Sequence, residues 1–152
     1  MADAELPEVG ADKPDAEQFG RGLGPGLGVN LLVTDVLVSA RFQVRVLGAE
    51  AAYLDDDFAI MRHSGTTWML HHDRTYRNHP LVGIAQGADG RGAGIELRIY
   101  GCDPDEAVRK ARAEGVIVLA EAADKPHGLR EAYLIDTDGY VWVPSAPKSD
   151  PA

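Results

Sequence analysis

The clearest pattern in the chain is an alternation of apolar and polar residues between positions 95 and 100. Alternation with a period of two is typical of a strand that turns one face to the core. The apolar residues share the core face, and the opposite face carries Glu96, Arg98 and Tyr100. A glutamate, an arginine and a tyrosine on one strand face offer both signs of charge and an aromatic ring. We therefore predict a binding surface there.

A helix is expected directly after this strand. Asp103 suits the N-cap and Pro104 the first helical position, and the two acidic residues that follow are favoured by the helix dipole. Gly115 then ends the helix, because glycine readily adopts the left-handed backbone that follows many helices.

The same order of signals occurs earlier in the chain. Residues 29–33 predict a strand, Asp35 an N-cap, residues 36–46 a helix and Gly48 its end. Gly48 and Gly115 are 67 positions apart, and apolar residues recur at similar positions in both helices. We interpret the two stretches as an internal repeat, in which each copy is one supersecondary unit.

Each predicted helix is followed by three short runs with strand character. After the first helix they are residues 51–54, 58–62 and 66–71; after the second they are residues 116–119, 130–135 and 140–143. An Asp-Gly hairpin turn joins the last two runs. Each half is therefore strand, helix and three strands. We expect an α+β fold in which two tandem βαβββ units form a curved mixed sheet around a cavity, with the helices outside.

This pattern predicts one domain with a tail at each end. The stretch before the first strand contains prolines and glycines without apolar periodicity, and the stretch between the units is polar and rich in glycine. The expected parts are a flexible N-terminal tail (1–27), a domain (28–145) with units at about 28–73 and 94–145 and a linker at 74–93, and a flexible C-terminal tail (146–152).

Composition narrows the class of protein. With 45% hydrophobic and 26% charged residues, the chain is expected to be globular, and its net charge of −9 argues against binding to nucleic acid, whose phosphates need a basic surface. No apolar run has the length of a membrane span, and the acidic start is unlike a signal peptide. The single cysteine, Cys102, excludes an internal disulfide and is typical of a reducing compartment, so a cytoplasmic location is expected.

Two tandem βαβββ units in a chain of this length resemble the glyoxalase I/bleomycin-resistance protein/extradiol dioxygenase superfamily, which has the vicinal oxygen chelate fold. The resemblance covers residues 29–145. It rests on Asn-Leu-Leu-Val-Thr-Asp at 30–35, Ser-Ala-Arg-Phe at 39–42, Leu-Gly at 47–48, Lys-Pro-His-Gly-Leu-Arg-Glu at 125–131 and Asp-Thr-Asp-Gly-Tyr at 136–140. Because the functions of this superfamily are diverse, the fold does not select one of them.

The resemblance also implies where a metal would bind. The metal enzymes of the superfamily carry His or Glu at four positions, on the first and last strands of each unit, and these positions correspond to Gly28, Met69, Glu96 and Val143. Only Glu96 can ligate a metal, whereas catalytic sites need about three protein ligands. We therefore expect no metal cofactor, and the chain is most similar to the metal-free, bleomycin-resistance-like members.

The resemblance implies a ligand site on the concave sheet face. The expected ligand-binding residues are Asn30, Met69, His71, Glu96, Arg98, Tyr100 and His127. For Glu96 and Arg98, an ion pair that satisfies itself is an equally good interpretation. No catalytic residue is assigned.

Three functions remain open at this point. The first is a small-molecule binding protein that binds or sequesters an unidentified compound in the concave sheet without the usual metal. The second is a metal-dependent lyase, isomerase or dioxygenase with a rearranged site that includes Glu96 and His71. The third is a non-catalytic interaction domain. We favour the first function. The resemblance also implies that the protein forms a homodimer. Neither nucleic acid nor a membrane is expected as a partner.

Overall fold

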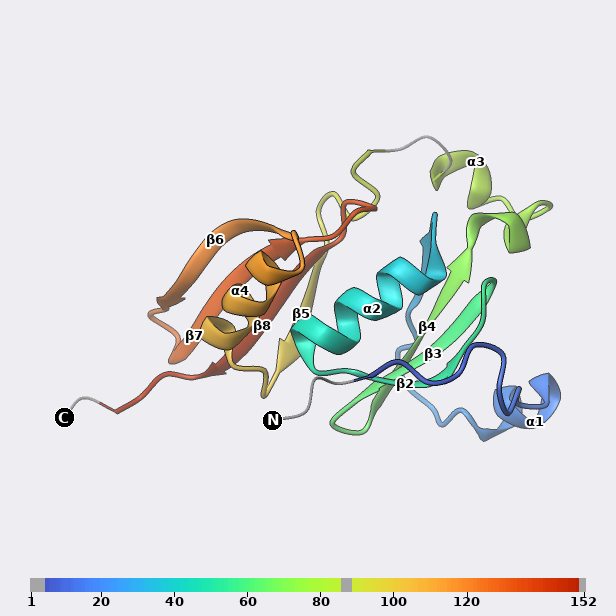
Figure 1. Cartoon of the computed structure of the whole chain (residues 1–152), viewed down its shortest axis with the longest axis horizontal. Coiled ribbons are helices and arrows are strands. Elements are labelled where there is room, and N and C mark those ends of the chain that lie inside the picture. Colours follow the sequence, from blue (N-terminus) through green and yellow to red (C-terminus); the bar gives the residue numbers. More distant parts are fainter. Residues whose placement is uncertain (1–4, 86–88, 151–152) are drawn as a thin grey trace.

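The computed structural model of the chain describes residues 5–85 and 89–150 (Figure 1). It contains two four-stranded mixed sheets with helices, which confirms the α+β fold and the two tandem βαβββ units. The sheets are separate and open rather than one continuous curved sheet, because the first strand of each unit pairs on one side only and stays at an edge. In the described part of the chain, no helix has the length and apolar character needed to cross a membrane.

The first unit contains sheet A and one long helix. Strand β1 pairs with β4 in parallel, and the remaining neighbours are antiparallel, in the order β1-β4-β3-β2. Its elements are β1 (Asn30–Val33), α2 (Val36–Leu47), β2 (Glu50–Leu54), β3 (Phe58–His63) and β4 (Thr66–His72).

The second unit repeats this arrangement in sheet B. Here β5 pairs with β8 in parallel, and the order is β5-β8-β7-β6. Its elements are β5 (Glu96–Tyr100), α4 (Pro104–Ala113), β6 (Ile117–Asp124), β7 (Leu129–Ile135) and β8 (Val141–Pro147).

The predicted helix signals are confirmed in both units. The Asp35 carboxylate accepts a hydrogen bond from the backbone N–H of Val38 at 2.9 Å, and Asp103 caps α4 in the same way. Gly48 follows α2 with a φ of +71°, and Gly115 follows α4 with a φ of +73°. These values lie in the left-handed region, where a side chain would be strained, so glycine is required at both ends.

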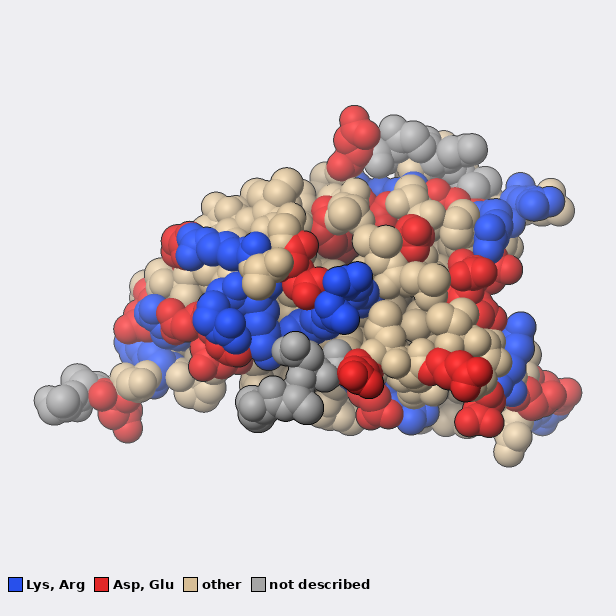
Figure 2. All heavy atoms as spheres, in the orientation of Figure 1, with Lys and Arg blue, Asp and Glu red and all other residues tan. Residues whose placement is uncertain are grey.

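One core runs through both units. Helices α2 and α4 contact each other as well as their own sheets (Figure 1). Phe42 of α2 packs edge-on against Trp142 of β8, with ring centroids 6.1 Å apart, so the first unit's helix touches the second unit's sheet. Arg41 and Arg45 of α2 each bind Glu114, the C-cap residue of α4, at 3.2 Å. Figure 2 shows Lys and Arg side chains interspersed with Asp and Glu side chains on the face in view.

The segment between the units also ties them together. Arg91 binds both carboxylate oxygens of Asp73, at 2.6 and 2.7 Å, and donates to the backbone carbonyl of Leu32 at 3.1 Å. Asp138, in the β7–β8 turn, accepts hydrogen bonds from the backbone N–H and the hydroxyl of Thr34. The end of β1 is thus held by the second unit, which fixes how the two sheets are placed.

Among the described residues, three short helices lie outside the repeat: α1 (Ala16–Gly22), a 3₁₀ helix η1 (Asp73–Tyr76) and α3 (Val82–Ala85). The first lies in the predicted N-terminal tail, and its Phe19 packs edge-on against Phe58 of β3 with centroids 6.4 Å apart. Because α1 buries no residue, the hydrophobic pattern gave no signal for it. Parts of the predicted tails and linker (1–4, 151–152 and 86–88) lie outside the described residues, and the flexibility of the tails stays a prediction.

Candidate functional site

The predicted alternation places three side chains on one face of β5. Glu96, Arg98 and Tyr100 lie there, and the sheet register adds a fourth group from β7. Tyr100 pairs with Ser145 of β8, and Ser145 pairs with Glu131 of β7. Paired residues in a sheet share a face, so Glu131 lies on the same face as Tyr100, two strands away.

Arg98 is the centre of this group. Its Nη1 donates to Glu96 Oε2 at 2.8 Å, its Nε donates to the Tyr100 hydroxyl at 3.2 Å, and its Nη2 donates to Glu131 Oε1. Burial lowers the pKa of Arg98, but the hydrogen bonds that it donates to Glu96, Tyr100 and Glu131 outweigh burial and raise the pKa. The guanidinium therefore stays charged and is held by partners on both sides.

Glu131 is the buried partner, with a side chain only 1% exposed. Besides Arg98, its carboxylate contacts His127 Nε2 at 2.7 Å and accepts a hydrogen bond from the Tyr133 hydroxyl at 3.2 Å. Burial by itself raises the pKa of Glu131, but the hydrogen bonds from His127 and Arg98 and the charge of Arg98 hold it below the ordinary value. The carboxylate is therefore ionised at neutral pH, which a buried group tolerates only with such partners.

We call Glu96, Arg98, Tyr100, His127, Glu131 and Tyr133 the polar face. Its outer members are accessible: the Glu96 side chain is 49% exposed, and His127 and Tyr100 are also exposed. Lys125 lies over the Tyr133 ring, with its Nζ 5.3 Å from the centroid. The arrangement thus combines a fixed, buried charge pair with exposed carboxylate, imidazole and phenol groups.

Sheet A carries the other three predicted residues. Asn30 of β1 pairs with Met69 of β4, and His71 lies two residues further along β4. The His71 ring is 4.9 Å from Phe58 and 5.1 Å from Tyr76, and burial lowers its pKa. The structure thus joins four of the seven predicted residues by hydrogen bonds, directly or through Glu131, and places the remaining three on the other sheet.

Glu131 and Tyr133 were missed from the sequence, although the register contains a signal for Glu131. The Asp-Gly turn after β7 pairs Ile135 with Val141, and counting outward along a regular hairpin then pairs Glu131 with Ser145. That count places a carboxylate opposite the last strand, near the polar side of β5. Its contact with Arg98 depends on the parallel pairing of β5 with β8, which the sequence pattern does not specify.

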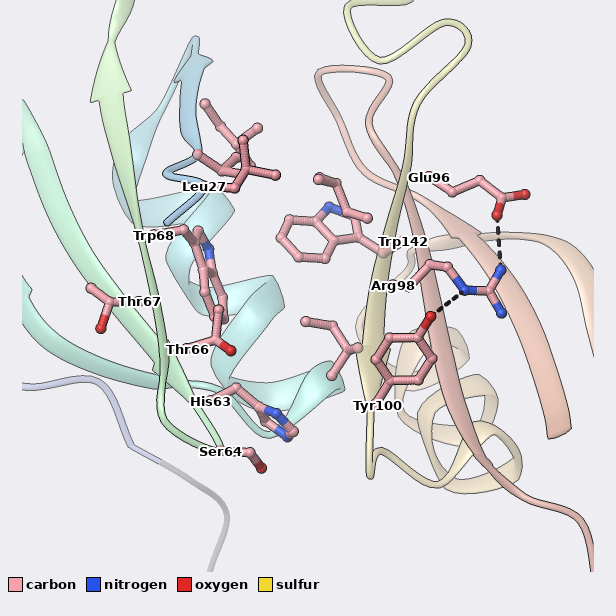
Figure 3. Close-up of a pocket in the computed structure, with 14 residues that line it drawn as sticks. Leu27, His63, Ser64, Thr66, Thr67, Trp68, Glu96, Arg98, Tyr100 and Trp142 are labelled. Atoms are coloured by element: carbon pink, nitrogen blue, oxygen red, sulfur yellow. Dashed lines mark hydrogen bonds and ion pairs between the residues drawn. The ribbon is translucent and has the colours of Figure 1, made fainter. Parts of the chain in front are cut away.

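Strand β5 also borders a cavity, which all five residues of the strand line. Leu97 and Ile99 lie in its wall together with Trp142 of β8 and Trp68 of β4, and its volume is about 370 Å³. Figure 3 shows both indoles directed into the space between the sheets, whereas the charged ends of Glu96 and Arg98 turn to the other side of β5. We call this space the inter-unit cavity.

Comparisons with known proteins agree on the fold. No protein-family model matches the sequence, and no curated protein matches it. Among solved structures, a glyoxalase/bleomycin resistance protein/dioxygenase family enzyme from Burkholderia phytofirmans PsJN aligns with a TM-score of 0.66 and 15% identity over 80% of this chain and 97% of that one. A glyoxalase/bleomycin resistance protein/dioxygenase from Nocardioides aligns with a TM-score of 0.60 and 21% identity over 90% of this chain and 94% of that one. A glyoxalase-related enzyme from Fulvimarina pelagi aligns with a TM-score of 0.63 and 18% identity, over 82% of this chain and 88% of that one.

The chain has the glyoxalase/bleomycin-resistance fold. The resemblance noted in the sequence is therefore confirmed at the level of the fold. At these identities, the likeness carries neither a substrate nor a reaction to this chain.

The residues present do not fit the metal that this fold carries in its metal enzymes. Gly28, Met69 and Val143 offer no strong ligand atom, and the Glu96 carboxylate is bound to Arg98. Within the described ranges, no group of three His, Cys, Asp or Glu side chains could hold a metal ion. Because no such group contains His71 and Glu96 in the described part of the chain, the structure does not favour the rearranged metal site.

Proposed function

We propose that this protein binds a small organic molecule on the polar face of sheet B. The observation that carries the proposal is the ion pair between Arg98 and the buried Glu131. Exposed side chains such as that of His127 border this pair on the solvent side. A buried ion pair contributes little net stability compared with apolar packing, so its presence on a sheet face needs another reason. Small-molecule sites commonly combine a few fixed polar groups in this way.

The exposed groups indicate the chemistry of the ligand. Only Oε2 of Glu96 is engaged by Arg98, so Oε1 is available to a hydrogen-bond donor. The Tyr100 ring beside it is 59% exposed and can contact a cation through its face. A net charge of −9 attracts cations over longer distances. We therefore infer that the ligand carries an amine or another strong donor group.

A thermal-shift screen tests this proposal. The protein is screened against small amines, the neutral isosteres of the same compounds, and divalent metals. A ligand at 100 times its Kd adds about 2.7 kcal/mol to the free energy of unfolding, a rise in Tm on the order of 5–10 °C for a domain of this size. We expect amines to raise Tm more than their isosteres. A stabilising effect confined to metals would contradict the proposal.

We also propose that the protein forms a homodimer and resides in the cytoplasm. Strand β6 is an eight-residue edge strand, and its Ile117 and Leu119 side chains are 62% and 53% exposed. Exposed edges with apolar residues are readily covered by another strand, and a second copy would supply one. The lone Cys102 supports the cytoplasmic location, since it has no partner within the chain for a disulfide.

A further inference from the structure

The inter-unit cavity is built by both units. Leu31 of β1 and Trp68 of β4 form one wall, and Leu97, Ile99 and Trp142 of sheet B form the other (Figure 3). Its volume of about 370 Å³ lies in the range of small-molecule sites. Glu96, Arg98 and Tyr100 of the polar face also border it, but the charged ends of Glu96 and Arg98 turn to the other side of β5 (Figure 3).

The aromatic floor of the cavity is fixed in place. The indole N–H of Trp68 donates to Gln43 Oε1 at 2.8 Å, and that of Trp142 donates to Asp136 Oδ2 at 2.9 Å. The two ring centroids are 6.1 Å apart, and the ring planes are inclined by 50°. Because both N–H groups are satisfied inside the protein, the rings present only apolar surface to the cavity.

Polar groups lie at one end of the cavity. His63, Ser64 and Thr66, in and beside the β3–β4 turn, border the cavity (Figure 3). Leu27 also lies at its border, at the other end from His63 and Ser64 in Figure 3, and is 96% exposed, so it has little contact with the rest of the chain. An occupant near Leu27 would cover its side chain, and one at the other end could bond to the hydroxyl of Ser64 or Thr66.

We propose that the inter-unit cavity is a second ligand site, one that takes a planar aromatic compound of about two fused rings with a single hydrogen-bonding group. Such a ring system packs against the apolar wall of the cavity, to which Trp68 and Trp142 contribute the small parts of their indoles that are exposed, 6% and 2%. The volume is at the low end for small-molecule sites and so suits a compound of this size. The proposal differs from the amine site in its use of Leu31, Trp68 and Trp142, which line the cavity and are not part of the polar face, although Glu96, Arg98 and Tyr100 border both.

Tryptophan fluorescence tests this directly, because the two tryptophans of the chain both line the cavity. The wild-type protein is titrated with 2-naphthol, and the tryptophan emission is corrected with free tryptophan under the same conditions. We expect saturable quenching with one 2-naphthol per chain. The non-planar alcohol 2-decalol should fail to displace it.

A matched pair of variants separates this site from the rest of the surface. Leu27→Asp places a charge at the border of the cavity. Because Leu27 is 96% exposed, we expect the variant to fold normally. We expect the concentration of 2-naphthol that gives half-maximal quenching to rise at least tenfold. Leu119→Asp makes the same change on β6, outside the cavity, and should leave the titration unchanged. Three results would each overturn the proposal. The quenching could rise linearly without saturation, or both variants could have equal effects on it. It could also disappear as the protein concentration rises, because a second copy of the chain fills the cavity.

Discussion

Glu131 is 1% exposed, yet its carboxylate is ionised because Arg98, His127 and Tyr133 surround it. In the folded protein its pKa lies below the ordinary value. The ionised Glu131 carboxylate therefore adds its full contribution to the free energy of unfolding above the pKa of about 4.3 that a glutamate has in the unfolded chain. This contribution is lost as the pH falls through the lower pKa of Glu131 in the folded protein.

Replacing Glu131 with glutamine tests this account at the residue scale. The variant leaves Arg98 without its buried partner, and we expect a loss of about 3–5 kcal/mol in the free energy of unfolding at pH 7. Urea unfolding of both proteins at several pH values measures the difference, which should shrink below about pH 4. Glu121→Gln, which removes a carboxylate from an exposed pair with Arg112, is the control and should cost much less. If the difference in the free energy of unfolding between the wild type and Glu131→Gln stayed constant down to pH 3, the assignment of a negative charge to Glu131 would be wrong.

At the scale of elements, the β7–β8 hairpin depends on Gly139. Its φ is +84°, and a Cβ there would lie 2.7 Å from the Asp89 carbonyl oxygen, so the linker approaches the turn too closely for a side chain. Gly128, in the β6–β7 turn, has a φ of +90° but open space around it. Gly128→Ala therefore carries backbone strain alone, on the order of 1–2 kcal/mol, whereas Gly139→Ala adds a clash. We expect a clearly lower Tm for Gly139→Ala; equal values would show that the linker contact is not needed.

The sequence pattern predicts the elements well where one side of an element is buried. Alternation identified β5, and the caps Asp35 and Asp103 identified both helices, because those signals are local. The same reasoning missed α1, which buries no residue, and it missed Glu131, whose role depends on a strand pairing. Local patterns specify which face of a strand is polar, but the partners on that face come from other strands.

At the scale of the whole molecule, the relative placement of the two sheets depends on contacts that no local pattern contains. Arg91 reaches Asp73 and the Leu32 carbonyl from the linker, and Asp138 reaches Thr34 across more than a hundred residues of sequence. These contacts leave two separate sheets with a cavity between them, where the repeat alone suggested one continuous surface.

The homodimer is a prediction at this same scale. Sedimentation equilibrium at micromolar concentration should give about twice the 16.3 kDa of one chain. Ile117→Lys places a charge on the exposed edge strand β6 and should give the monomer mass without loss of folded structure, because that side chain is 62% exposed. A wild-type mass near 16.3 kDa would contradict the dimer, and a dimer that Ile117→Lys leaves intact would contradict the β6 interface.

The central claim, a small-molecule site on the polar face, is tested most directly by calorimetric titration of the best amine from the screen. Wild-type protein and Glu96→Ala are compared, with Glu106→Ala as the control, since Glu106 is also part of an exposed ion pair but lies on α4. Loss of the Glu96 pair should cost only about 0–1 kcal/mol of stability, so the variant remains folded. We predict at least tenfold weaker binding to Glu96→Ala, about 1.4 kcal/mol, and no change in Glu106→Ala. Equal affinity of all three proteins for the amine would contradict the account.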